Sequence, residues 1–332
     1  MLYCGVCHSD CHVGLNDLHS TKYPFVGGHE LLGKVVEVGA KVTKHKVGDH
    51  VGVGCIVDAC LDCPTCKDGD ENYCMKGLTG TYNGTRKYGR VAGNQENNTW
   101  GGYSGSHVVN EHFAIKIPEG LPLEKAAPIL CAGITLYDPI KHWGGCEGKK
   151  MTIGIVGLGG LGTMGVKIAR ALGHDVVAIS TSAKKEAMAK EKGATHFVVS
   201  TDPESVKKME WTCDLILNTV SAKHDVNAYL PLLNKSGTIV QLGLVTETHT
   251  ISQLPLVFHR KAIAGSCIGG IANTQECLDL CAKHNITPDC QMIEANQIDW
   301  AWEQLTGSGN ADGIRYVIDI KKSLANESFV PK

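Results

Sequence analysis

The sequence predicts an α/β protein of two domains, an antiparallel β-barrel or sandwich followed by a doubly wound parallel sheet. Three observations lead to this class. The chain has 332 residues, which is more than one ordinary hydrophobic core usually serves. Up to about residue 130, short apolar runs alternate with glycine-containing turns. From Met151 onward, apolar strands alternate instead with helical segments.

The first part of the chain reads as short antiparallel strands. Clear examples are the runs at 33–39, 49–53 and 112–117, each of them short and rich in β-branched or aromatic residues. The segment 81–100 is polar and rich in Gly and Asn, so a long surface loop is expected there. These features favour a barrel or sandwich over a helical domain.

The second part reads as strand, glycine, helix, strand. Strands are expected over 151–156, 176–180, 197–199, 215–220, 238–242 and 261–268. That alternation predicts a parallel sheet with helices on both faces. A helix over 274–284 and a last strand over 316–320 should then pack back on the first domain. We therefore expect a division into residues 1–130, 131–268 and 269–332.

Composition excludes several classes of partner. The net charge of −2 and the pI near 6.7 give no nucleic-acid footprint. No apolar run approaches the roughly 20 residues that a membrane helix needs, so no membrane partner is expected. Met1 leads directly into Leu2 and Tyr3, without a signal-peptide pattern. Fifteen cysteines with clustered, metal-type spacing favour a cytoplasmic, reducing environment.

Four closely spaced cysteines form the most specific motif of the chain: Cys60, Cys63, Cys66 and Cys74. The gaps of two residues let one backbone turn present two sulfurs to one ion, and Zn²⁺ accepts four thiolates in a tetrahedral site. A closed site of this kind stabilises a loop and has no open position for catalysis. Free buried thiols or disulfides are the alternative.

A glycine-rich turn forms the second motif. It consists of Gly157, Leu158, Gly159, Gly160, Leu161 and Gly162. It directly follows the apolar strand 151–156 and opens a helix whose apolar stripe ends at a capping Gly173. In that context the glycines let a dinucleotide pyrophosphate approach the backbone N–H groups at the helix N-terminus. A turn that binds nothing is the alternative.

The end of the second strand of this unit indicates which cofactor binds. NAD sites place an acid about 20 residues beyond the first glycine, at the ribose 2′-hydroxyl. Here the residues are Ser180, Thr181, Ser182 and Lys185, with no carboxylate before Glu186. Hydroxyls and lysines suit a 2′-phosphate, so NADP(H) is predicted over NAD(H). Ser182 also fits the plainer role of a helix N-cap.

A second metal site could be assembled from distant residues. Cys7, His29 and Cys131 would give two sulfurs and an imidazole, an open sphere of the catalytic type. Spacing alone cannot bring these residues together, and a single buried His or Cys is more often structural.

Taken in order, these motifs resemble the zinc-dependent medium-chain alcohol dehydrogenases, closest to the cinnamyl-alcohol-dehydrogenase-like branch. The resemblance rests on 7–10, 28–30, the four cysteines, 131–135 and 157–162. It implies a GroES-like barrel carrying two zinc ions per chain, a Rossmann domain, and an active site in the cleft between them. Cys7, His29 and Cys131 would bind the catalytic zinc, and Cys55 lies outside the ligand spacing. The chain begins late relative to the family motifs, so the first domain is expected to be N-terminally short.

The same resemblance implies the remaining roles. Glu30 matches a residue that can approach the zinc, and Asp10 one that orients His29. Ser9 and His12 match the pair that passes the proton of the alcohol to solvent. The expected cofactor contacts, beyond the glycine turn and the 180–185 segment, are Thr135, Thr219, Gly243, Ser266 and Ile268.

The expected activity is hydride transfer between NADPH and an aldehyde whose carbonyl zinc polarises. Lignin-pathway members carry aromatic residues where this chain has Leu78 to Gly80 and Cys267, so a broad aldehyde reductase is expected. The resemblance also implies a homodimer or homotetramer. Two alternatives remain open, a polyol-type dehydrogenase of the same superfamily and a zinc-stabilised, NADPH-binding scaffold without turnover.

Overall fold

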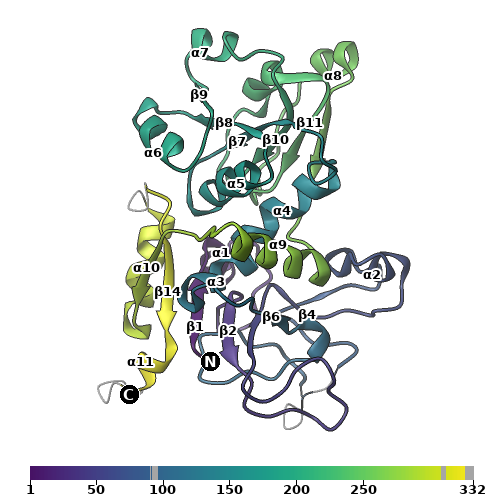
Figure 1. The fold of residues 1–332 in the computed structure, drawn as a ribbon, viewed down its shortest axis with the longest axis vertical. Helices are drawn as coiled ribbons and strands as arrows, with labels where there is room; N and C mark the ends of the chain where they lie inside the picture. The colour runs from purple at the N-terminus through teal and green to yellow at the C-terminus, as the bar shows by residue number, and fades with distance from the viewer. Residues whose placement is uncertain (90, 92–95, 308–311, 326–332) are drawn as a thin grey trace. The chain divides into compact units, whose positions relative to one another are not determined.

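The computed structural model describes residues 1–89, 91, 96–307 and 312–325 as two compact units. Unit 1 comprises Met1–Ile134 and Ile268–Lys332, and unit 2 comprises Thr135–Cys267. Figure 1 labels most of the helices and strands of each unit. The predicted α/β class is confirmed, because an antiparallel-rich sheet in unit 1 accompanies a parallel sheet in unit 2.

Unit 1 is built on a six-stranded sheet in the order β13-β14-β1-β2-β3-β6. The segments near the two ends of the chain meet in it, since β1 pairs antiparallel with β14 (Figure 1). Its elements before residue 131 are β1 (Tyr3–Val6), α1 (His8–Gly14), β2 (Leu31–Lys34), β3 (His50–Val53), β4 (Ile56–Asp58), α2 (Pro64–Lys67), β5 (Thr79–Gly80), β6 (Ile115–Lys116) and α3 (Leu123–Ala126). After residue 268 they are α9 (Ile271–Lys283), β13 (Cys290–Ile293), α10 (Ile298–Thr306), β14 (Arg315–Asp319) and α11 (Ile320–Ala325).

Two of the strands predicted for this unit are shorter than expected. The strand predicted over 33–39 ends at Lys34. Beyond it, the side chain of Val36 is 82% exposed and does not contribute to the core. The strand predicted over 112–117 keeps only Ile115 and Lys116, because Asn110 accepts a hydrogen bond from the His112 N–H and starts a 3-10 turn. Both predicted strands are present, but their predicted bounds were wrong at both ends. The predicted loop 81–100 lies partly outside the described residues, and Thr85 and Asn98 form a bridge within it.

Unit 2 is a parallel sheet in the order β12-β11-β10-β7-β8-β9. Its elements are β7 (Thr152–Val156), α5 (Gly160–Ala171), β8 (Asp175–Ser180), α6 (Glu186–Glu191), β9 (His196–Val199), α7 (Pro203–Lys207), β10 (Cys213–Asn218), β11 (Leu233–Gln241), α8 (Gln253–His259) and β12 (Ala262–Gly265), and α4 (Ala132–His142) leads into it. Every strand predicted here is present, with shifts of a few residues at its ends. The inner strands are buried, as a sheet covered on both faces requires.

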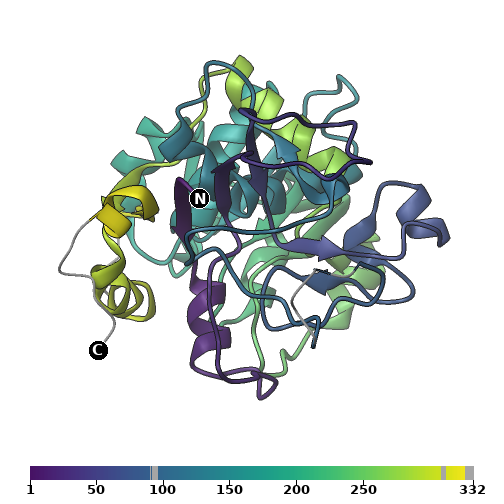
Figure 2. The same ribbon diagram turned by 90° about the horizontal axis from the view of Figure 1, so that it is seen from below.

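The segment with the four closely spaced cysteines forms a separate lobe of unit 1. This cysteine lobe, residues 60–74, contains α2 and a 3-10 turn at Glu71–Tyr73. Figure 2 shows α2 on an arm that extends away from the strands of unit 1. Across the described segments, we find no helix that combines the length and the apolar character needed to cross a bilayer.

Candidate active site

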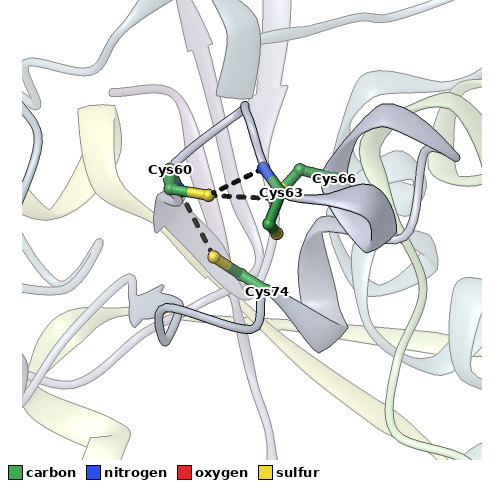
Figure 3. Close-up of side chains that lie close together, drawn as sticks. All are labelled: Cys60, Cys63, Cys66 and Cys74. Atoms are coloured by element: carbon green, nitrogen blue, oxygen red, sulfur yellow. Dashed lines mark hydrogen bonds between the residues drawn. The ribbon is translucent and has the colours of Figure 1, made fainter.

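The four lobe cysteines converge on one point (Figure 3). Their sulfur atoms all lie within 4.8 Å of one another, and the Cys60 and Cys66 sulfurs are 3.9 Å apart. Bonds of 2.3 Å in a tetrahedron place sulfurs about 3.8 Å apart, so the set fits zinc. Backbone N–H groups already support the sulfurs, since Cys60 N–H donates to Cys74 Sγ and Cys63 N–H to Cys60 Sγ.

Local sequence explains how the lobe turns so tightly. Pro64 occupies the first turn of α2, where its fixed φ favours the helix, and Gly69 adopts a φ of +86° just after that helix. The contact with the Thr65 hydroxyl, whose oxygen lies 3.2 Å from the Cys63 sulfur, is the main cause that lowers the pKa of Cys63 to about 5. Metals bind the thiolate, so a lowered pKa favours metal binding at this cysteine.

A second cluster brings together residues that are far apart in the sequence. Ligand atoms of Cys7, His29, Glu30 and Cys131 all lie within 4.8 Å of one another, and all four residues are buried. Cys7 precedes α1, His29 and Glu30 precede β2, and Cys131 follows a 3-10 turn at Ala127–Leu130. All four belong to unit 1. Two thiols and an imidazole, with a carboxylate close by, form a donor set that suits a catalytic zinc.

Asp10 supports this cluster by a hydrogen bond to His29. Its carboxylate is fully buried, and His29 Nδ1 donates to Oδ1 at 2.8 Å. Three other donors complete its environment: Gly28 N–H to Oδ1 at 3.2 Å, Cys7 N–H to Oδ2 at 2.9 Å and Tyr103 O–H to Oδ2 at 2.9 Å. Because Nδ1 is engaged, Nε2 of His29 is the nitrogen left for a metal.

Glu30 is held by Arg315, a residue that sequence reasoning missed. Arg315, at the start of β14, forms a buried ion pair with Glu30 Oε1. Within the described residues, Glu30 Oε2 has no hydrogen-bond partner. The Cys131 thiol and then the charges of Arg315 and His29 hold the pKa of Cys7 well below its usual value, although burial opposes them. The cluster therefore favours a thiolate at Cys7.

Ser9 and His12 lie on α1, directly after Cys7. The Ser9 hydroxyl oxygen is 3.7 Å from the Cys7 sulfur. His12 Nδ1 contacts Asp17 Oδ2 at 2.8 Å, and its ring stacks on His8 with centroids 4.5 Å apart. His12 Nε2 has no hydrogen-bond partner in the part of the chain that is described. This nitrogen is thus available for a proton.

The glycine turn in unit 2 has the geometry that a dinucleotide needs. Gly157 directly follows β7 and has a φ of +85°, and α5 begins after its N-cap residue, Gly159. A Cβ on Gly162 would collide with the Gly157 carbonyl, whereas a Cβ on Gly159 would meet no described atom within 4 Å. Gly162 therefore closes the turn, and Gly159 leaves open space at the helix N-terminus where a phosphate can approach.

Most of the predicted cofactor contacts in unit 2 share one edge of the sheet. Gly157, Ser180, Thr219, Gly243 and Ser266 end or follow β7, β8, β10, β11 and β12. Carboxyl ends of parallel strands meet at the same edge, which is where ligands of such sheets bind. Thr219 Oγ1 donates to the Val156 carbonyl at 2.7 Å, so that hydroxyl also supports the turn.

The remaining predicted contacts occupy several elements. Ser182 caps the 3-10 turn Ala183–Lys185 by accepting from Lys184 N–H, so its plainer role is present. Thr135 lies in α4 and is buried, and Ile268 belongs to unit 1. Neither Arg315 nor Tyr103 carried a sequence signal. Arg315 meets its partner Glu30 across 285 residues of sequence, and Tyr103 meets Asp10 across 93.

Comparison with known proteins identifies relatives along nearly the whole chain. A model of the alcohol dehydrogenase GroES-like domain matches residues 1–119, and a model described as zinc-binding dehydrogenase matches residues 160–283. The chain is 46% identical over 318 residues to NADP-dependent alcohol dehydrogenase C 1 of Mycolicibacterium smegmatis, covering 96% of this chain and 88% of the relative. It is 47% identical over 326 residues to cinnamyl alcohol dehydrogenase 8 of Arabidopsis thaliana, covering 98% and 88%.

A solved structure extends the likeness to three dimensions. CAD from Helicobacter pylori complexed with NADP(H) superposes with a TM-score of 0.86 at 37% identity, covering 97% of this chain and 90% of that one. The predicted resemblance is therefore confirmed by sequence and by fold.

Proposed function

Because this chain belongs to the zinc-dependent medium-chain alcohol dehydrogenases, in their cinnamyl-alcohol-dehydrogenase-like branch, we propose that it interconverts aldehydes and alcohols at the Cys7–His29–Cys131 cluster. It is an NADP-dependent alcohol dehydrogenase, or aldehyde reductase. The observation that carries the proposal is the buried convergence of two thiols and an imidazole, backed by Asp10.

Three residues around that cluster, Asp10, Ser9 and His12, would have separate roles in the reaction. Zinc, when bound, supplies a Lewis acid for the carbonyl oxygen, and NADPH supplies the hydride. Asp10 keeps His29 in the tautomer that presents Nε2. The Ser9 hydroxyl, 3.7 Å from the Cys7 sulfur, is the first proton carrier. His12 takes the proton on Nε2, while Asp17 holds Nδ1.

We further propose a second zinc in the cysteine lobe, which makes two per chain. The proposal is supported by four sulfurs at spacings that a tetrahedral ion bridges. A zinc held by these four thiolates would have no open position, so it would stabilise the lobe without taking part in the reaction. Fifteen cysteines, none of them in a disulfide, suit a reducing cytoplasm, where we place the enzyme.

We also propose a homodimer or homotetramer. Strand β12 is an end strand of the parallel sheet, with one side of its backbone left unpaired among the described strands. Beside it in sequence, α8 exposes three apolar side chains, at Leu254, Val257 and Phe258, each at least 65% exposed. An unpaired edge and an apolar helix face together favour pairing with a second copy. Light scattering of the purified protein measures this directly.

The substrate class follows from what the site lacks. Leu78, Thr79 and Gly80 follow the cysteine lobe, and Cys267 follows β12, where lignin-pathway members carry aromatic residues. We therefore propose a preference for medium aliphatic and simple aromatic aldehydes. A preference for coniferaldehyde over both benzaldehyde and hexanal by more than about tenfold contradicts this.

One experiment separates this function from its alternatives. NADPH oxidation is followed with a mixed set of aldehydes, beside a zinc count per chain. Two zincs with oxidation support the reductase, and one zinc without oxidation supports the scaffold. Oxidation of polyols in preference to primary alcohols supports the polyol-type dehydrogenase. Cys7→Ala should lose one zinc and all turnover while NADPH binding survives, and retained turnover in this variant rejects the assigned cluster.

A further inference from the structure

The strand order of unit 2 locates the crevice in which a dinucleotide binds. Strands β8 and β9 lie on one side of β7, and β10, β11 and β12 lie on the other. Sheets of this kind consist of two mononucleotide-binding halves, and the dinucleotide lies across the point between them, at the carboxyl ends of the strands. The glycine turn follows β7, and the hydroxyls and lysine that suit a 2′-phosphate follow β8. The segment that follows β10 therefore borders the other mononucleotide.

Asn218, the last residue of β10, is the centre of a polar network at this edge of the sheet. Its side chain is fully buried. Asn218 Nδ2 donates to Gln241 Oε1 at 2.7 Å and to His224 Nε2 at 2.8 Å, and Asn218 Oδ1 accepts from Val220 N–H at 3.3 Å. Because Val220 N–H can only donate, it fixes which side of the amide carries the oxygen. Both hydrogens of the buried amide therefore have an acceptor, and His224 is one of the two.

The same contacts fix the tautomer of His224. Its Nδ1 lies 2.7 Å from the Ala222 carbonyl oxygen, which can only accept, so Nδ1 carries the proton and donates. Nε2 is then the acceptor that Asn218 Nδ2 requires. His249 Nδ1 lies 3.1 Å from the His224 carbonyl oxygen and holds the backbone there as well. The imidazole thus joins the irregular segment 219–225 back to the end of β10.

The start of that segment packs against the glycine turn. A Cβ on Gly157 would lie 2.8 Å from Thr219 Oγ1 and 3.2 Å from Val220 Cγ2. A Cβ on Gly243, which follows β11, would collide with the Val220 carbonyl. Thr219 also donates twice to the Val156 carbonyl, from N–H at 3.0 Å and from Oγ1 at 2.7 Å. Thr219 and Val220 therefore form a wall at the carboxyl ends of β7 and β11, and Asn218 fixes the Val220 backbone.

We propose that His224 is a positioning residue, which acts through Asn218 to hold Thr219 and Val220 as the wall of the second mononucleotide site and so sets the affinity for the nicotinamide half of NADPH. The inference rests on the proposed function, in which NADPH is the cofactor, and it concerns residues of unit 2 alone. Loss of the His224 acceptor leaves a buried N–H of Asn218 unsatisfied, so the amide turns and releases Val220. The adenosine half binds on the β8 side and is independent of His224.

The test compares two ligands and three replacements of His224 in the zinc-loaded enzyme. The dissociation constant of NADPH is measured by its fluorescence, and that of 2′,5′-ADP, which lacks the nicotinamide half, by calorimetry. His224→Ala removes both ring contacts, whereas His224→Asn reaches the Ala222 carbonyl but not Asn218. Each should weaken NADPH by about tenfold and leave 2′,5′-ADP within about twofold. His224→Gln is long enough to offer an oxygen to Asn218 Nδ2, so it should restore NADPH affinity to near that of the wild type.

His196 provides the matched control, because it is an exposed histidine at the first residue of β9, on the opposite edge of the same sheet. His196→Ala should leave the affinity for both ligands unchanged. If His224→Ala does not fold, His224→Asn carries the comparison alone. Equal weakening of both ligands in His224→Asn, or of neither, overturns the inference, and so does a His224→Gln enzyme that binds NADPH as weakly as His224→Asn. A wild-type enzyme that binds neither ligand overturns the use of NADPH and the inference together.

Discussion

Replacing Asp10 by Asn tests whether the carboxylate behind His29 governs the metal centre. The side chain keeps its size, but one acceptor oxygen becomes an NH₂ group. With the amide oxygen toward His29 and Gly28, that NH₂ faces Cys7 N–H and the Tyr103 hydroxyl. The Tyr103 O–H can rotate to accept, whereas Cys7 N–H cannot. One buried donor therefore loses its acceptor.

The expected magnitude follows from that single loss. A hydrogen bond to a charged group contributes about 1.5–3 kcal/mol, and an unsatisfied buried donor costs about 1–3 kcal/mol. We expect unfolding free energy to fall by about 2–4 kcal/mol. Zinc affinity at the cluster should fall by about 10–100-fold, because the imidazole loses its charged partner. Urea denaturation measures the first quantity, and competition with a chromophoric chelator measures the second.

Tyr103→Phe is the graded control. It removes one neutral donor and leaves the carboxylate, so the loss should stay near 1 kcal/mol, with zinc affinity changed by less than about threefold. The reasoning is refuted if Asp10→Asn binds zinc as tightly as the wild type. It is also refuted if the two variants are indistinguishable in both measurements.

Three further changes test other parts of the site. His12→Ala should lower kcat by up to about 10²-fold with NADPH affinity unchanged, and an unaltered kcat at both neutral and acidic pH contradicts its role. Lys185→Ala should reduce the preference in kcat/KM for NADPH over NADH by about tenfold, because a charge-assisted contact to the 2′-phosphate is lost; an unchanged ratio counts against that contact. Burial acts to raise the pKa of Glu71, but hydrogen bonds from His112 and Ile271 N–H outweigh it and hold the pKa below the ordinary 4.5. The ionised carboxylate therefore stabilises the fold above pH 4.5. This contribution is lost as the pH falls through the lower pKa of the folded state. The free energy of unfolding of Glu71→Gln should therefore fall less on acidification than that of the wild type.

Sequence patterns were most informative where the chemistry is local. The strands of unit 2, the glycine turn and the four cysteines of the lobe are each encoded within a few tens of residues. Hydrophobic periodicity and turn residues are sufficient for such features. The patterns failed where burial depends on distant partners. Val36 and Val38 resemble strand residues, yet they lie beyond the end of β2 and are 82% and 38% exposed, respectively.

The candidate site shows the same division. Cys7, His29 and Cys131 were predicted as a set only through a family resemblance, since no spacing rule joins residues so far apart. Arg315 and Tyr103 were missed, because each meets its partner only after the sheet of unit 1 has formed. The sequence by itself determined the fold class, the cysteine lobe and the dinucleotide turn. Tertiary structure alone decided the convergence of the metal ligands, the donors around Asp10 and the hydrogen bond from Ile271 N–H to Glu71. Such contacts depend on long-range packing rather than on neighbouring residues.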